Sequence, residues 1–127
     1  MASINKVTLI GHVGGDPEIR FTEDGTTIAN FSLATNENWT AKDGTKRERT
    51  EWHRIEVFGK PAEIARDFVR KGKPLYVEGS IKYEEYVDKE GVKKTATKIR
   101  VNGFNSKIFL LGHRTDTELG LEAEKVA

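Results

Sequence analysis

The amino-acid sequence predicts an all-β protein with one short helix, and three observations support this fold class. The chain has 127 residues, about the length of one domain. Most of it consists of short runs of β-branched and aromatic residues that alternate with polar ones and end at glycine-containing turns. Only the segment that follows Gly59 carries apolar residues at helical spacing. We therefore expect one β-sheet domain with a single helix packed on it.

The first half of the chain contains three predicted strands. The first covers 7–13 and ends at a turn rich in glycine. The second covers 28–35, and we expect a polar loop over 36–49 to follow it. The third covers 51–58, where apolar and polar residues alternate.

The second half of the chain begins with the predicted helix. Pro61 suits the first turn of a helix, and the apolar residues at helical spacing after it are Ala62, Ala65, Phe68 and Val69. Alternating residues from Leu75 onward predict a strand that runs to a turn at 88–91 and returns as a second strand to Val101. This pair forms a long β-hairpin arm with a polar tip. A last apolar segment covers 104–111.

Three strands, one helix and two strands follow one another in the order of a five-stranded oligonucleotide/oligosaccharide-binding (OB) barrel. We therefore expect a five-stranded OB-fold barrel over residues 1–111, with the hairpin as an arm. An unrelated β-barrel or a split α+β sandwich would give a similar string of elements. Apolar density falls after Gly112, so we expect 112–127 to form a short, flexible C-terminal tail.

Composition and motifs exclude several classes of protein. No run approaches the roughly 20 apolar residues that cross a bilayer, and the N-terminus lacks the apolar core of a secretory signal, so we expect a cytoplasmic protein with no membrane partner. The chain has no cysteine, and its three histidines show no metal-binding spacing. We therefore expect no enzyme activity, no metal and no cofactor. The net charge of +1 is itself no sign of nucleic-acid binding.

The third predicted strand is the most informative segment. Because side chains of a strand alternate between its faces, one face carries His53, Ile55 and Val57, which can line a barrel core. The other face carries Trp52, Arg54, Glu56 and Phe58. Exposed aromatic rings beside a cation suit single-stranded nucleic acid, whose bases stack on rings while cations contact phosphates. The alternative is that both rings pack under the loop or against another subunit.

Further aromatic residues lie among cations on two segments next to this strand. Trp39 stands in the polar loop, which is rich in lysine and arginine, and Tyr83 and Tyr86 stand on the hairpin arm among lysines. Aromatic rings interleaved with Lys and Arg on mobile segments are typical of a groove that wraps single strands.

Several motifs occur in the order and spacing of one protein family. They are Asn5-Lys6-Val7, Asp16-Pro17-Glu18, Ala34-Thr35, Thr50-Glu51-Trp52-His53-Arg54, Phe58-Gly59-Lys60, Arg70-Lys71-Gly72 and Val77-Glu78-Gly79. With them, the chain resembles the bacterial-type single-stranded DNA-binding (SSB) proteins over about residues 3–111. The string at 50–54, followed by Phe-Gly-Lys at 58–60, is the most specific of these motifs.

The resemblance implies an OB-fold protein, usually a homotetramer, that binds and protects single-stranded DNA without strong sequence preference in replication, recombination or repair. It implies four base-stacking residues, Trp39, Trp52, Phe58 and Tyr86. It implies five phosphate-contacting residues, Lys6, Arg54, Lys60, Arg70 and Lys71. It implies that His53 lies at a subunit interface and that the protein is associated with the nucleoid. Apolar residues on both faces of the first strand, Val7 and Leu9 against Ile10, fit a strand covered on both sides.

The end of the chain departs from the family pattern. Family members carry a linker that ends in an acidic peptide closed by Pro-Phe, which recruits repair and replication proteins. The present sequence ends at 122–127 without that peptide, so we do not expect recruitment by this route. The alternative function is an OB-fold protein-interaction module of a replication-restart type complex, with weak DNA binding.

Overall fold

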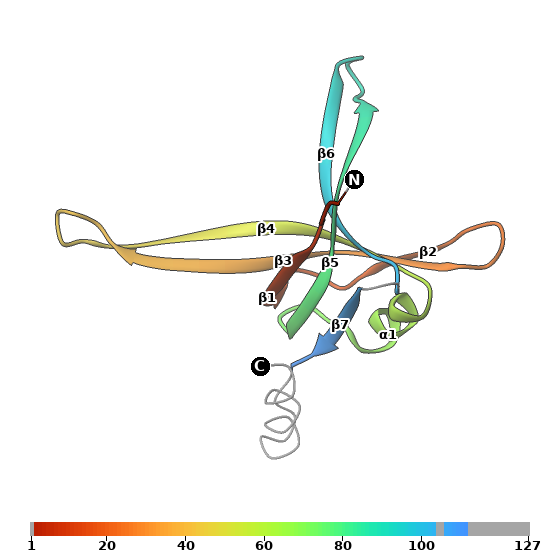
Figure 1. Cartoon of the computed structure of the whole chain (residues 1–127), viewed down its shortest axis with the longest axis horizontal. Coiled ribbons are helices and arrows are strands. Elements are labelled where there is room, and N and C mark those ends of the chain that lie inside the picture. Colours follow the sequence, from red (N-terminus) through yellow and green to blue (C-terminus); the bar gives the residue numbers. More distant parts are fainter. Residues whose placement is uncertain (1, 104–105, 112–127) are drawn as a thin grey trace.

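The backbone forms a closed β-barrel from which two long hairpins project (Figure 1). The structure is a computed structural model that describes residues 2–103 and 106–111. The elements in chain order are β1 (Val7–Val13), β2 (Glu18–Phe21), β3 (Thr27–Thr40), β4 (Lys46–Phe58), α1 (Lys60–Phe68), β5 (Pro74–Val87), β6 (Lys93–Val101) and β7 (Lys107–Leu110). The expected tail over 112–127 lies outside the described residues.

The strand pairing closes the barrel. β1 pairs antiparallel with both β3 and β5, β3 pairs antiparallel with β4, and β5 pairs antiparallel with β6. The ring is completed by a parallel pair, β4 with β6, in which Ile55 lies opposite Ile99. The helix follows the third of these barrel strands. This is the connectivity of the five-stranded OB barrel, and it confirms the predicted fold.

Two short strands lie beside the barrel and were not predicted as strands. β2 pairs with β3, and β7 pairs with the outer edge of β5. Each has four residues, too few to show a clear alternation in the sequence.

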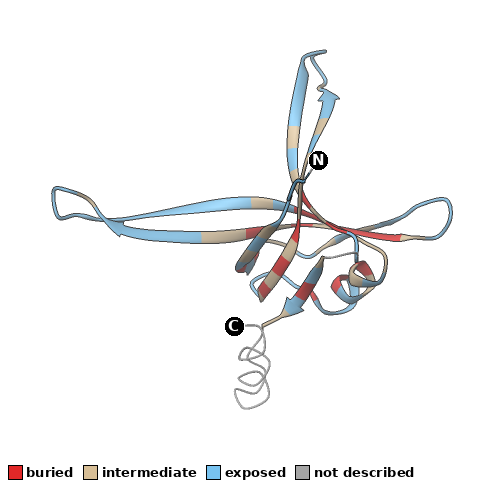
Figure 2. Ribbon diagram, in the orientation of Figure 1, coloured by how far each residue is buried: buried red, intermediate tan, exposed pale blue. Residues whose placement is uncertain are grey.

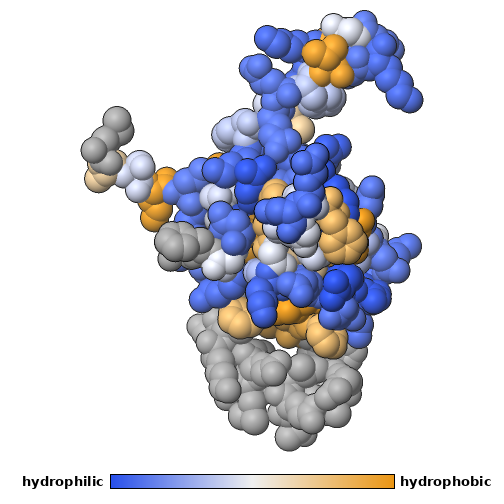
Figure 3. Space-filling view, turned by 90° about the vertical axis from the view of Figure 1, so that its right-hand side faces the viewer, coloured by the Kyte–Doolittle hydropathy of each residue, from blue (hydrophilic) through white to orange (hydrophobic). Residues whose placement is uncertain are grey.

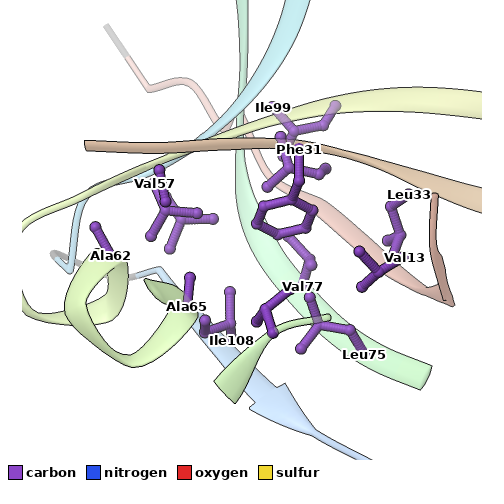
Figure 4. Close-up of a cluster of buried hydrophobic side chains, with 14 residues drawn as sticks. Val13, Phe31, Leu33, Val57, Ala62, Ala65, Leu75, Val77, Ile99 and Ile108 are labelled. Carbon is purple, nitrogen blue, oxygen red and sulfur yellow. The ribbon is translucent and has the colours of Figure 1, made fainter. Parts of the chain in front are cut away.

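The hydrophobic core fills the barrel (Figures 2 and 4). Its members come from the barrel strands, from α1 and the residue after it, and from β7. The largest fully buried apolar ones are Leu33, Ile55, Val57, Val69, Leu75, Val77 and Val101. Ile55 and Val57 are thus confirmed as core residues. The alternation that predicted them is the two-residue period of a strand with one buried face.

The helix α1 covers one end of the barrel with Ala62 and Ala65. Gly59 leaves β4 with a φ of 76°, a backbone conformation that favours glycine, and Pro61 stands in the first turn as predicted. The predicted apolar face is wrong at Phe68, which is exposed at the last position of the helix. Val69 takes an extended conformation there and turns its side chain into the core.

The predicted polar loop over 36–49 is also wrong. β3 and β4 continue through it as an antiparallel ladder that pairs Trp39 with Arg47 and ends at a tight turn (Figure 1, left). Here the ribbon has left the barrel, so both faces are in solvent and no hydrophobic alternation marks the strands (Figure 2). The backbone ladder holds this extension together, with side-chain bonds such as the one that Thr50 Oγ1 donates to Asn36 Oδ1 at 2.7 Å. The hairpin arm of β5 and β6 is confirmed.

Candidate nucleic-acid interface

Strands β3, β4, β6 and β5 present a continuous surface on the side of the barrel wall away from the core. In the ladders, Glu56 lies opposite Arg100, and Arg100 lies opposite Ser80. Alternation along each strand then places on this surface a set of aromatic and charged side chains that includes Trp52, Arg54, Glu56, Phe58, Lys98, Arg100, Lys82, Glu84 and Tyr86. We call this surface the outer face. In the view of Figure 3 the surface of the described residues is mostly hydrophilic, with hydrophobic residues in scattered patches.

Trp52 has the most exposed ring of the predicted stacking residues, with 62% of its surface accessible. It lies opposite Ala34 in the ladder with β3, and its ring passes close to Gly14. A methyl group at Gly14 would lie 2.6 Å from Cζ3 of this ring and would also clash with the Ser32 hydroxyl. The glycine therefore makes the space that the ring occupies.

Glu56 corrects the predicted pattern of the outer face, because it is only 2% exposed. Its Oε1 accepts hydrogen bonds from Nε and Nη2 of Arg100 at 3.1 and 2.9 Å. Its Oε2 lies 3.4 Å from Arg20 Nη2 and 3.5 Å from Lys98 Nζ. A buried carboxylate requires such partners. They come from β2 and β6, which are distant in sequence, so the alternation of β4 alone could not reveal them.

Phe58 is half-buried, contrary to the expectation of a freely exposed ring. The Arg100 guanidinium lies over it, with Cζ 5.1 Å from the ring centroid, at the distance of a cation–π contact. Its ladder partner Ile28 is also buried, although it is not part of the barrel core. Phe58 therefore contributes to packing on the outer face as well as offering an aromatic surface.

A shallow depression on the outer face connects the cations of neighbouring strands. Its lining includes Arg54 from β4, Lys98 from β6, and the polar residues Asn30 and Ser32 from β3. Arg54 is exposed, as predicted. The Glu18 carboxylate also lines it. Two cations and two neutral polar groups beside this single carboxylate suit the phosphates of a nucleic-acid strand that crosses the sheet.

Trp39 is exposed on the β3–β4 hairpin, but the structure does not place it on the same face as Trp52. Trp52 pairs with Ala34 and Trp39 pairs with Arg47, so the two tryptophans lie an odd number of ladder steps apart. They therefore stand on opposite faces of this ribbon. Trp39 borders its own hollow, which Lys46 and Arg47 also line.

Tyr86 continues the outer face along the arm. It is exposed opposite Lys94, on the ribbon face that also carries Glu84 and Lys98. Tyr83 is exposed on the other face of the same ribbon.

The remaining predicted cations surround the barrel. Lys6 Nζ lies 3.7 Å from Glu78 Oε2 on β5, and Lys60 is the exposed first residue of α1. Arg70 donates to the carbonyl oxygens of Arg66 and Val69 at the end of α1. The Lys71 backbone N–H donates to Asp16 Oδ1 at 2.9 Å, which holds this exposed pair beside the turn that also contains Gly14.

His53 lies on the opposite face of β4 from Trp52, as predicted. It is half-buried, and its Nε2 lies 2.9 Å from Thr35 Oγ1.

Sequence reasoning missed the three cations that contact Glu56, namely Arg20, Lys98 and Arg100. Lys98 and Arg100 alternate with buried Ile99 and Val101, which is a signal that could have found them. Arg20 lies on β2, which was not predicted as a strand.

Two further observations limit the chemistry of the described residues. Within 2–103 and 106–111 no three His, Cys, Asp or Glu side chains are grouped so that they could hold a metal ion. In the same part of the chain no helix is long and apolar enough to span a membrane.

Comparison with known sequences points to one family. The family model described as "Single-strand binding protein family" matches residues 4–107. The chain is 44% identical over 117 residues to "Single-stranded DNA-binding protein 1" of Xylella fastidiosa, an alignment that covers 91% of this chain and 83% of that protein.

Comparison with solved structures agrees. A chain of the Plasmodium falciparum SSB complex with ssDNA superposes with a TM-score of 0.81 at 33% identity, covering 87% of this chain and 97% of that chain. A deletion mutant of the single-stranded DNA-binding protein from Thermus aquaticus gives a TM-score of 0.72 at 32% identity, covering 87% of this chain and 52% of that chain.

Proposed function

This chain belongs to the single-strand binding protein family, and we propose on that basis that it binds and protects single-stranded DNA on the outer face. The observation that carries the proposal is the exposed ring of Trp52, held over Gly14 and followed along β4 by Arg54. Bases stack on such rings while cations contact the phosphates, and neither contact depends strongly on sequence. We assign the protein no catalytic activity.

In this proposal the single-stranded DNA crosses the outer face from Trp52 toward the hairpin arm of β5 and β6. Bases stack on Trp52 and on the accessible part of Phe58, and Arg54 contacts phosphates in the depression. Tyr86 supplies a further ring on the arm. This use of an aromatic surface with interleaved cations explains why polar strands carry large exposed rings.

The other predicted residues extend the path around the barrel. Trp39 offers a ring on the face of the β3–β4 hairpin opposite Trp52. A DNA strand bound at Trp52 therefore reaches Trp39 only by passing around that hairpin. The cations that contact phosphates along this longer path are Lys6, Lys60, Arg70 and Lys71. A wrapped strand, rather than a straight one, accounts for their separate positions.

We further propose that the protein acts as a homotetramer at single strands exposed in replication, recombination or repair, in the cytoplasm. An apolar row crosses β1, β5 and β7, formed by Ile10, Tyr76 and Phe109 in ladder register. Ile10 is 58% exposed and Phe109 is 42% exposed, so a second copy would cover them favourably. In this proposal His53 also lies at a subunit interface, residues 1–111 form the binding domain, and 112–127 are a tail.

Comparison of single-stranded with duplex DNA tests the function. At one salt concentration, we expect poly(dT) to bind far more tightly than a duplex, whose bases are already stacked and cannot reach the rings. Affinity for poly(dT) should also fall as salt rises, because cations on phosphates release counterions. Equal affinity for both forms of DNA would contradict the proposal. Weak binding to both would favour the protein-interaction module instead.

A further inference from the structure

The cations at the centre of the outer face are neutralised by two carboxylates of different kinds. Glu56 is buried and contacts Arg20, Lys98 and Arg100. Glu84 contacts Lys98 and Arg100 as well, but it comes from the arm and its side chain is 43% exposed. The same two cations therefore have a buried partner beneath them and a second partner at the surface.

The Glu84 carboxylate bridges the two cations with one oxygen each. Its Oε1 accepts a hydrogen bond from Arg100 Nη2 at 2.9 Å, and its Oε2 lies 3.0 Å from Lys98 Nζ. A phosphodiester has two non-bridging oxygens that would take the same pair of cations in the same manner. The carboxylate thus stands where an anion of the ligand would bind.

We propose that the position between Lys98 and Arg100 is a phosphate-binding site for single-stranded DNA, that Glu84 fills it in the free protein, and that a phosphodiester displaces Glu84 on binding. This inference rests on the proposed function, since it concerns the same outer face. Glu56 stays in place and holds both cations when Glu84 leaves.

The difference in burial decides which carboxylate leaves. Moving Glu56 away from Arg20, Lys98 and Arg100 would break a buried charge cluster and leave charges without partners in the interior, which is costly. Glu84 can turn into water and lose only ion pairs near the surface, which are worth little. The pKa of Glu84 lies below its ordinary value, first because Lys98 donates a hydrogen bond to it and then because of the nearby charges of Lys98, Arg100 and Arg20. It is therefore ionised at neutral pH and competes with the phosphate.

The site also explains the position of Arg100 over Phe58. The Arg100 guanidinium contacts both the Phe58 ring and the Glu84 carboxylate. A phosphate that takes the place of Glu84 would therefore bring its nucleotide close to that ring. Phosphate binding and stacking at Phe58 would then involve the same nucleotide.

A pair of adjacent glutamates provides the test. Glu84→Gln removes the competing charge, and Glu85→Gln makes the same change in net charge on the opposite face of the ribbon, where Glu85 faces Lys93 at 3.8 Å. At a salt concentration where poly(dT) affinity is measurable, we expect Glu84→Gln to bind about 3- to 10-fold more tightly than Glu85→Gln. Thermal melts of both variants establish that they are folded.

A second set of variants tests whether Lys98 is one of the cations that bind the phosphate. Lys98→Gln should weaken binding and reduce the slope of log affinity against log salt by about 0.7, as loss of one single-strand phosphate contact does. In the Lys98→Gln background, Glu84→Gln should give less of a gain than it gives alone. An abasic deoxyribose-phosphate oligomer, which has no bases to stack, should show the same order of affinities.

The outcomes separate this inference from the proposed function. If the unmodified protein fails to bind poly(dT), the proposed function is wrong. If it binds but Glu84→Gln matches Glu85→Gln, or if the gain is undiminished in the Lys98→Gln background, the phosphate site between Lys98 and Arg100 is wrong.

Discussion

Gly14 shows how one missing side chain positions the ring of Trp52. Its backbone N–H donates to the Ser32 carbonyl oxygen at 2.8 Å, so the backbone here cannot move away from the ring without breaking that bond. Gly14→Ala is therefore expected to displace the Trp52 ring and to weaken single-strand binding by up to about 1–3 kcal/mol, the worth of one base–aromatic stack. Fluorescence titration with poly(dT) measures this.

Gly15 is the matched control for that substitution. A Cβ at Gly15 meets no other atom within 4 Å, so Gly15→Ala should leave affinity unchanged. If both alanine variants bind like the parent protein, Gly14 does not position Trp52.

The prediction of individual site residues succeeded where the strand pattern alone determines exposure. Trp52 and Arg54 follow from alternation in β4. The burial of Glu56 could not be predicted, because it depends on Arg20 and Arg100, and only the closed barrel brings those side chains to β4.

At the scale of the element, β4 separates stability from binding between its two faces. Trp52→Ala should lose about 1–3 kcal/mol of single-strand affinity with little change in stability, because the ring is exposed. Ile55→Ala should instead leave a cavity that costs about 2–5 kcal/mol of unfolding free energy, while the folded fraction keeps its affinity. Phe58→Ala should lower both quantities, because Arg100 covers the ring. Thermal melts and poly(dT) titrations measure the two effects.

A loss of stability at Trp52 in place of the expected loss of affinity would contradict this division between the two faces of β4. If Trp52→Ala unfolds the protein while binding per folded molecule persists, the ring is part of the packing and is no stacking surface.

The turns that join β2 to β3, β3 to β4 and β5 to β6 share a feature that makes them sensitive to acid. In each turn an aspartate accepts hydrogen bonds from residues that follow it, and the three aspartates are Asp24, Asp43 and Asp88. The pKa of each carboxyl is lowered, chiefly by the Thr22 hydroxyl at Asp24, by the Thr45 hydroxyl at Asp43 and by the Val92 backbone N–H at Asp88.

The sign of the effect follows from the lowered pKa. A carboxyl with a depressed folded pKa stabilises its turn fully above its ordinary pKa of about 4, and this contribution is lost as the pH falls below that value through the folded pKa. We expect faster amide hydrogen exchange at the arm turn as the pH falls below about 4, beyond the intrinsic pH dependence of exchange. Asp88→Asn should remove this extra dependence at the arm turn and leave it at the other two. An unchanged protection profile in acid would contradict this role of the aspartates.

The β3–β4 hairpin shows why element ends were the hardest feature to predict. The sequence indicates a loop because polar residues fill 36–49, but hydrophobic alternation marks only strands that have one buried face. Outside the barrel, backbone pairing and the Asp43 turn suffice to hold the ribbon.

At the scale of the whole molecule, the order of elements was enough to predict the barrel. The strand pattern gave the barrel strands, and the helix stood where the OB connectivity requires it. The order of elements does not predict self-association of the chain, because the proposed interface depends on the apolar row that crosses β1, β5 and β7.

Self-association can be tested on that row. By light scattering at micromolar concentration, we expect a mass four times the 14.3 kDa of one chain. Ile10→Asp should reduce the mass, because it places a charge in the apolar row of the proposed interface while leaving the barrel core intact. A monomeric parent protein would refute the tetramer, and a stable dimer would favour the protein-interaction module.

The central claim is that single-stranded DNA binds the outer face at Trp52, and the two tryptophans of the chain allow a direct measurement. Trp39→Phe leaves Trp52 as the sole tryptophan, so its fluorescence reports on this one position. We predict that poly(dT) strongly quenches the emission of this variant as bases stack on the ring, and that duplex DNA at the same concentration leaves it nearly unchanged. If poly(dT) binds the variant while the Trp52 emission stays constant, the strand does not pass over the outer face at Trp52.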